Sequence, residues 1–281
     1  MDLAQLVRAA LDEDIGPGDL TTEACIDDAA AGEGILLAKQ DLVVCGHRVA
    51  KRVFKEVARR TGGLLSYEVV HDDGSRVATR TAIAQLRGSL RTLLIGERVA
   101  LNFLMRMSGI ATHVGAYVDA ASGRLRVVDT RKTTPLLRSL EKYAVRTGGA
   151  HNHRYALYDG VLIKDNHIAA VGSVARAVTR ARATVHHLVR IEVEAGTLEQ
   201  LDEAVKAGAD AVLLDNMDDA LLRQCVAHAR AMRPEVILEA SGNMTPERIR
   251  GLRDIGLDVV SAGGLVHQAR WVDLSLDIVQ S

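Results

Sequence analysis

The segment 188–216 reads LVRIEVEAGTLEQLDEAVKAGADAVLLDN, and it predicts a strand, a helix and a second strand in that order. Thr197 and Gln200 form a capping box at the start of the helix, whose apolar residues recur three and four positions apart, and Gly208 ends it. The run Ala211–Leu214 does not alternate with polar residues, which is typical of a strand covered on both faces by helices. The segment therefore predicts a βα unit of a parallel sheet.

The same pattern recurs through the second half of the chain, where six short apolar runs are each followed by a polar or glycine signal and a helical stretch. The runs are Leu125–Asp129, Val161–Ile163, Leu188–Val193, Ala211–Leu214, Val236–Leu238 and Val259–Val260. Thr134-Pro135 and Thr245-Pro246 each place a capping hydroxyl before a proline at the first helical position. Six βα units favour an α/β barrel or near-barrel over an antiparallel fold.

Residues 1–107 have a different pattern. Short segments broken by Gly16-Pro17-Gly18 and Gly62-Gly63 flank an amphipathic helix at about 46–60, which predicts an α+β domain with antiparallel strands. We place the boundary within the helical stretch Gly96–Ala121, so that a barrel domain spans 108–268 and a tail spans 269–281.

Composition limits the kind of partner. The 281 residues include 35 Lys and Arg against 36 Asp and Glu, with two Phe and one Trp, so the sequence offers neither a basic field nor a set of stacking side chains for nucleic acid. Cys25, Cys45 and Cys225 form no C-x-x-C pair, which argues against a disulfide framework and a zinc site. Because the N-terminus reads as an amphipathic helix and no apolar run could span a bilayer, we expect a cytoplasmic protein that acts on small molecules.

Charged residues follow the strands at the edge where α/β barrels place their active sites. Arg131, Lys132, Arg154 and Lys164 lie after the first two strands or in the loop between them, and such cations bind carboxylate or phosphate groups.

The later strands end in carboxylates and glycines. Glu194 and Asp215 end adjacent strands, and we expect them to bind Mg²⁺, which prefers one or two carboxylates together with water and substrate oxygens. Ser241-Gly242 and Gly263-Gly264 follow the last two strands, where backbone N–H groups can bind a phosphate.

Several of these stretches resemble the signature sequences of the quinolinate phosphoribosyltransferase family, also called nicotinate-nucleotide pyrophosphorylase (carboxylating). The similar strings are DTRKTTP (129–135), LEKYAV (140–145), NHR (152–154), LIKDNH (162–167), GDLTT (18–22), ER (97–98), LNFL (101–104), LLDN (213–216), EASG (239–242) and DLSL (273–276). They span essentially the whole chain, and their combination is far more specific than any one of them.

The resemblance implies a fold, a reaction and an assembly. The fold is an incomplete (open) α/β barrel beside an N-terminal α/β sandwich that the C-terminal tail joins. The reaction transfers phosphoribosyl from phosphoribosyl pyrophosphate (PRPP) to quinolinate with decarboxylation, giving nicotinate mononucleotide, pyrophosphate and CO2 in NAD biosynthesis. The assembly is a homodimer whose active site is shared between subunits.

The resemblance also implies roles for individual residues. Those expected to line the quinolinate pocket are Arg131, His153, Arg154 and Lys164, with Arg98 reaching in from the partner subunit. Lys132, Glu194 and Asp215 are expected to act in catalysis, the two carboxylates through Mg²⁺ and the ribose hydroxyls. The residues expected at the PRPP phosphate are Ser241, Gly242, Asn243, Gly263 and Gly264.

Three positions depart from the family pattern. Asn243 replaces a second glycine, Gly264 replaces a common alanine, and Ala195-Gly196 replaces the usual pair after Glu194. Asn tolerates left-handed backbone better than other non-glycine residues, so we expect the phosphate turn to persist.

Three alternatives remain at this point. A paralogue found with molybdate transporters has the same fold and another acceptor, but generally lacks the KDNH string that is intact at 164–167. A Schiff-base aldolase would use Lys164 as a nucleophile. A non-catalytic sensor would bind a phosphorylated sugar and tolerate the loss of Glu194.

Overall fold

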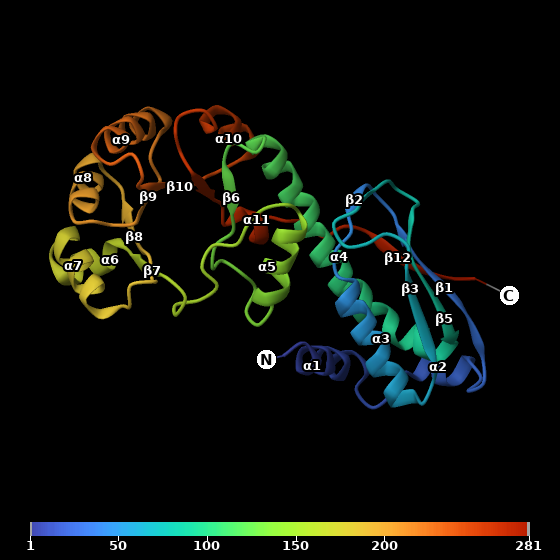
Figure 1. Cartoon of the computed structure of the whole chain (residues 1–281). Coiled ribbons are helices and arrows are strands. Elements are labelled where there is room, and N and C mark those ends of the chain that lie inside the picture. The colour runs from blue at the N-terminus through green and yellow to red at the C-terminus, as the bar shows by residue number, and fades with distance from the viewer. Residues whose placement is uncertain (1, 280–281) are drawn as a thin grey trace. The chain divides into compact units, whose positions relative to one another are not determined.

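The computed structural model describes residues 2–279, which form two compact units (Figure 1). The first unit comprises the described residues of the ranges 1–115, 134–149 and 269–281, and the second comprises 116–133 and 150–268. Both units are therefore discontinuous in sequence, because the chain enters the second unit, returns to the first for residues 134–149, and returns once more for the tail.

The second unit is built on a six-stranded parallel sheet with the order β6-β11-β10-β9-β8-β7. Its strands are β6 (Arg126–Val128), β7 (Val161–Ile163), β8 (Ile191–Ala195), β9 (Ala211–Asp215), β10 (Ile237–Ser241) and β11 (Val259–Ser261). Its helices are α6 (Asp165–Val171), α7 (Val174–Thr184), α8 (Leu198–Lys206), α9 (Asp219–Met232), α10 (Pro246–Leu252) and α11 (Gly264–His267). Helices α7 to α10 lie outside the curved sheet (Figure 1), so the prediction of an open α/β barrel is confirmed.

Helix caps fix where these βα units turn. The side chains of Thr197 and Thr245 accept hydrogen bonds from the third backbone N–H of α8 and α10, and Pro246 occupies the first turn of α10, as the sequence predicts. The capping box at Thr197 is only half formed, because the Gln200 side chain accepts from the Gly196 N–H. Buried apolar residues on α8 and on every position from Ala211 to Leu214 supply the core that holds helix and strand together.

The helix expected at Thr134-Pro135 begins later than predicted. α5 (Arg138–Thr147) starts three residues beyond the proline, because Leu136 has a left-handed backbone with φ of 68° that a helix cannot include. Thr134 instead donates its backbone N–H and its hydroxyl to the buried carboxylate of Glu141.

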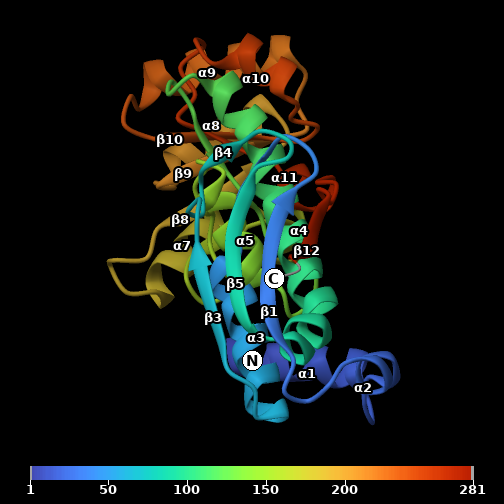
Figure 2. The same ribbon diagram turned by 90° about the vertical axis from the view of Figure 1, so that its right-hand side faces the viewer.

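The first unit contains an antiparallel sheet with the order β12-β1-β5-β3, seen face-on in Figure 2. Its strands are β1 (Ala31–Ala38), β3 (Leu65–Val69), β5 (Ala82–Ser89) and β12 (Leu274–Val279), with a separate pair β2 (Leu42–Val43) and β4 (Arg76–Val77). Its helices include α1 (Leu3–Ile15), α2 (Leu20–Cys25), α3 (His47–Thr61) and the start of the long α4 (Leu90–Ala121). Strand β12 lies in the tail and pairs with β1 from Glu33 to Ala38.

Within the described residues, no helix is both long enough and apolar enough to cross a lipid bilayer.

Candidate functional site

A cavity of about 630 Å³ lies at the carboxyl ends of the parallel strands. Twelve of the thirteen residues that the sequence marks for the site line it. They are Arg131, Lys132, His153, Arg154, Lys164, Glu194, Asp215, Ser241, Gly242, Asn243, Gly263 and Gly264. The volume lies in the range of small-ligand sites, and every one of these residues belongs to the second unit.

Arg98 is the residue that does not line this cavity. It lies on α4 in the first unit, with 60% of its side chain exposed, and its nearest recorded carboxylate is that of Glu97 at 4.0 Å.

One wall of the cavity carries two arginines. Burial and the positive charge of Arg131 both lower the pKa of Arg154 below its usual value, while Glu192 and Asp159 oppose the shift. The Arg154 guanidinium also donates to the Gly160 carbonyl at 3.0 Å. Two guanidinium groups that destabilise one another in the free protein are stabilised when an anion binds between them, so this wall favours a carboxylate or phosphate ligand.

A buried carboxylate holds the segment that carries this wall. Asp129 is fully buried at the end of β6, and it accepts the backbone N–H of His153 at 2.9 Å and the side-chain amide of Asn152 at 2.6 Å. A single parallel bridge between Val128 and His151 extends the sheet beyond β6. Asp129 therefore fixes where His153 and Arg154 enter the cavity.

Two carboxylates also line the cavity. The Nζ of Lys164 lies 2.5 Å from Oε2 of Glu194, and the Asn216 side chain donates to Oδ2 of Asp215 at 2.7 Å. Glu194 and Asp215 come from the neighbouring strands β8 and β9. Each carboxylate has two oxygens, so one on each remains to coordinate a hard cation or to meet ligand hydroxyls, and this donor set suits Mg²⁺.

The glycine turns approach their neighbours closely. Gly242 has a φ of 96°, and a Cβ there would meet Oδ1 of Asn216 at 2.2 Å. A Cβ at Gly263 would meet Cδ of Lys132, in the middle of its side chain, at 2.7 Å, whereas one at Gly264 would meet the terminal amide of Gln268, whose oxygen lies 2.6 Å away. Asn243 adopts the left-handed conformation with φ of 49°, so the turn persists without the second glycine, as expected.

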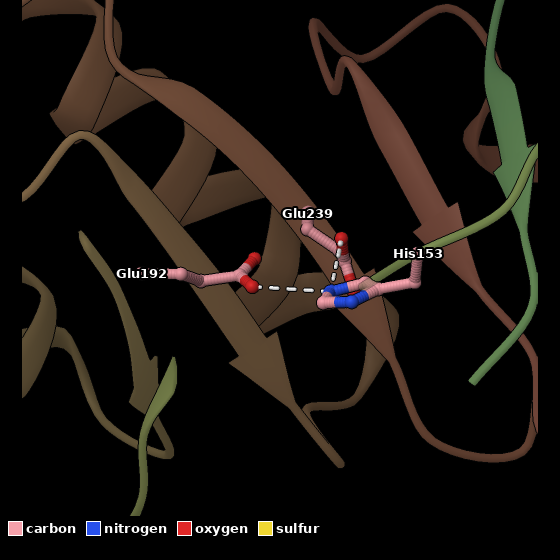
Figure 3. Close-up of side chains that lie close together, drawn as sticks. All are labelled: His153, Glu192 and Glu239. Atoms are coloured by element: carbon pink, nitrogen blue, oxygen red, sulfur yellow. Dashed lines mark hydrogen bonds and ion pairs between the residues drawn. The ribbon is translucent and has the colours of Figure 1, made fainter. Parts of the chain in front are cut away.

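His153 lies between two glutamates (Figure 3). Its Nε2 is 3.1 Å from Oε2 of Glu192 and 3.6 Å from Oε2 of Glu239, while its Nδ1 accepts the backbone N–H of Arg154 at 2.7 Å. Because Nδ1 accepts a hydrogen bond, the neutral imidazole carries its proton on Nε2. Burial lowers the pKa of His153, but the hydrogen bond to Glu192 and the charges of both carboxylates raise it further, so the net shift is upward.

Glu239 is 4% exposed on β10, lines the cavity, and has one carboxylate oxygen with no hydrogen-bond partner among the described residues. Burial and the charge of Glu192 raise the pKa of Glu239 to about 7, although His153 and the Ser261 hydroxyl oppose this. The ligand atoms of His153, Glu192 and Glu239 lie within 4.8 Å of one another, close enough for these three residues to hold a metal ion.

Sequence reasoning assigned no role to Glu192, Glu239 or Arg248. A strand repeats every two residues, so Glu192 faces the same side as Glu194, and Glu239 the same side as Ser241; that periodicity is the signal that marks them. Arg248 on α10 donates to the carbonyls of Gly242 and Met217, both at 2.6 Å, and contacts with backbone carbonyls leave no mark in a sequence.

Together the fold and the cavity are those of an α/β enzyme, with cations, carboxylates and glycine turns gathered at the strand ends. The family model described as Quinolinate phosphoribosyl transferase, C-terminal domain matches residues 110–277, and that of the N-terminal domain matches residues 19–108. The chain belongs to the quinolinate phosphoribosyltransferase family.

Individual relatives are similar to this chain over nearly all of their length. A probable nicotinate-nucleotide pyrophosphorylase [carboxylating] of Bacillus subtilis is 39% identical over 282 residues, covering 100% of this chain and 95% of the relative. The human nicotinate-nucleotide pyrophosphorylase [carboxylating] is 38% identical, covering 98% and 91%. The solved structure of the nicotinate-nucleotide pyrophosphorylase from Francisella tularensis has a TM-score of 0.92 at 34% identity, covering 99% and 96%.

Proposed function

We propose that this chain catalyses the transfer of phosphoribosyl from PRPP to quinolinate, with decarboxylation, to give nicotinate mononucleotide, pyrophosphate and CO2. The single observation that carries the proposal is the joining, in one cavity, of an arginine wall, a carboxylate pair and two glycine turns. Family membership and relatives named for the carboxylating activity support the same reaction.

The arginine wall is suited to quinolinate, a dianion. Arg131, Arg154 and Lys164 supply the positive charge, and His153 lines the same cavity. Each charge-assisted hydrogen bond contributes about 1.5 to 3 kcal/mol, so several are required to offset the desolvation of two carboxylates. Nicotinate has a single carboxylate and forms fewer of these bonds, which favours quinolinate.

The carboxylate and glycine side is suited to PRPP. Glu194 and Asp215 would hold Mg²⁺ and the ribose hydroxyls, and backbone N–H groups of the turns at Gly242 and Gly263 would bind the 5'-phosphate. The Lys132 side chain lies close to Gly263, and Lys132 would lie between quinolinate and pyrophosphate. Bound Mg²⁺ would neutralise charge on the pyrophosphate leaving group.

The reaction needs charge stabilisation more than covalent chemistry. As pyrophosphate leaves, positive charge develops at C1 of the ribose, and the carboxylates of Glu194 and Asp215 stabilise it. The pyridine nitrogen forms the new bond and becomes cationic, so it can accept the electron pair left at C2 when CO2 departs. A proton then replaces CO2 at C2.

The Nζ of Lys164 is engaged in an ion pair with the Glu194 carboxylate at 2.5 Å. A Schiff-base aldolase needs a neutral lysine nucleophile, so this pairing argues against that alternative.

The assay uses Mg²⁺ and PRPP with quinolinate in one tube and nicotinate in a parallel tube, and follows nicotinate mononucleotide. Product from quinolinate alone is the expected result. Product from nicotinate, or none in either tube from folded protein that still binds PRPP, would contradict the proposal and indicate another acceptor.

We also propose a cytoplasmic homodimer in which Arg98 of one subunit completes the quinolinate site of the other, since the Arg98 side chain is 60% exposed on α4. Mixing inactive Arg98→Ala subunits with inactive Glu194→Ala subunits should restore activity at a fraction of sites. Mixtures that stay inactive after proven subunit exchange would contradict a shared site.

A further inference from the structure

Glu192 and Glu239 lie beside the acceptor site but have no role in the reaction proposed above. Both side chains are largely buried, at 12% and 5% exposure, and both face the same imidazole nitrogen (Figure 3). We propose that both act on the quinolinate site through His153: Glu192 is a positioning residue that holds the His153 ring by a hydrogen bond, and Glu239, 3.6 Å from the same nitrogen, affects acceptor binding through its charge. This inference rests on the proposed function of the cavity.

The geometry of His153 leaves its ring little freedom. Nε2 donates to Glu192 at 3.1 Å, and Nδ1 accepts from the Arg154 backbone at 2.7 Å. Because both ring nitrogens are engaged within the chain, the orientation of the ring follows from Glu192 rather than from the ligand. Loss of the Glu192 carboxylate would remove the shorter of the two carboxylate contacts of Nε2 and allow the ring to rotate.

The surrounding charges determine whether the Glu239 carboxyl group is ionised. The titratable groups that face it are Glu192 from β8 and His153 from the loop after β6, while β9 contributes Leu213 and β11 contributes the Ser261 hydroxyl. No lysine or arginine is recorded as an ion-pair partner of Glu239 among the described residues. A second ionised carboxylate in this position would share one imidazole with Glu192, and it would repel an incoming dianion.

Protonation of Glu239 therefore favours acceptor binding. Its pKa, raised to about 7 by burial and by Glu192, means that it is mostly neutral below pH 7 and mostly ionised above pH 8. The negative charge of bound quinolinate disfavours the ionised form of Glu239 further, so the affinity for quinolinate should fall as the pH rises through 7. By linkage, binding near pH 7 should take up about half a proton per site.

The first test is the quinolinate dissociation constant by calorimetry from pH 6 to pH 8.5, for the wild type and for Glu239→Gln. Gln resembles the neutral acid in shape and charge. At pH 6 we expect the dissociation constants of the wild type and Glu239→Gln to agree within about threefold. At pH 8.5 we expect the wild type to bind quinolinate about tenfold more weakly than Glu239→Gln, a difference of roughly 1.4 kcal/mol. Glu235→Gln, an exposed carboxylate just before β10, is the matched control and should follow the wild type.

The second test separates positioning from general damage to the fold. Glu192→Ala should raise the KM for quinolinate about tenfold and leave the KM for PRPP within about twofold, whereas Glu192→Gln, whose amide oxygen still accepts from Nε2, should recover most of the loss. Equal changes in both KM values, or identical pH profiles for the wild type and Glu239→Gln, would overturn the inference. Binding of one Zn²⁺ per site by the wild type, lost in Glu239→Gln, would also overturn the inference and would indicate a metal site.

Failure of this inference is distinguishable from failure of the proposed function. A wild type that converts quinolinate while the glutamate variants behave like it would refute the positioning role alone. A wild type that converts no quinolinate would refute the function itself.

Discussion

Arg248→Met removes a side chain that joins two loops of the active site while keeping an aliphatic stem of similar length. The Arg248 guanidinium donates to the carbonyl of Gly242 in the phosphate turn and to that of Met217 after β9, and it pairs with Asp219 at 2.9 Å. The side chain is 19% exposed, so each charge-assisted bond to a carbonyl contributes about 1.5 kcal/mol, and the pair with the half-exposed Asp219 adds less than about 1 kcal/mol.

The expected loss is therefore about 3 kcal/mol, which corresponds to a decrease in Tm of roughly 6 to 12 °C. Release of the Gly242 and Met217 loops should also raise the KM for PRPP about tenfold, because small misplacements of binding groups are costly. Thermal unfolding and initial rates measure the two effects.

Arg250→Met is the matched control, because Arg250 lies on the same helix with 56% of its side chain exposed and contacts Glu247 at 3.5 Å. Its Tm and KM should stay close to those of the wild type. The reasoning is refuted if Arg248→Met and Arg250→Met behave alike in both measurements.

Three further substitutions test the residues assigned to PRPP and to quinolinate. Gly263→Ala places a Cβ 2.7 Å from the Lys132 side chain and should lower kcat about tenfold or more, whereas Gly264→Ala meets only the movable end of Gln268 and should stay within about twofold in the same assay. Lys164→Ala should weaken quinolinate binding about 10- to 100-fold, the value of one charge-assisted bond, and weaken PRPP binding much less; equal losses of both in calorimetry would contradict its assignment to the acceptor.

The parallel sheet could be predicted from strands such as β9, which is buried on both faces, because the sequence records that burial as an uninterrupted apolar run, Ala211–Leu214. Strand β5 in the first unit was not predicted. It contains Gln85, Arg87 and Gly88, and it forms because β1 and β3 pair with it on both sides, which depends on contacts distant in sequence.

The residues of the candidate site also divide into those that the sequence locates and those that it does not. Residues at strand ends are placed by the strands themselves, so Glu194 and Asp215 could be located from the sequence alone. The position of His153 depends on Asp129, 24 residues earlier, and on Glu192, 39 residues later, and no local pattern specifies either contact.

The most direct test of the account measures where the CO2 originates. Quinolinate labelled in the carboxylate at C2 is incubated with PRPP and Mg²⁺, and the amounts of labelled CO2 and of pyrophosphate are measured in the same sample. We predict one CO2 for each pyrophosphate, and no release of either product when nicotinate replaces quinolinate. Pyrophosphate formed without CO2 would contradict carboxylating phosphoribosyl transfer as the function of this cavity.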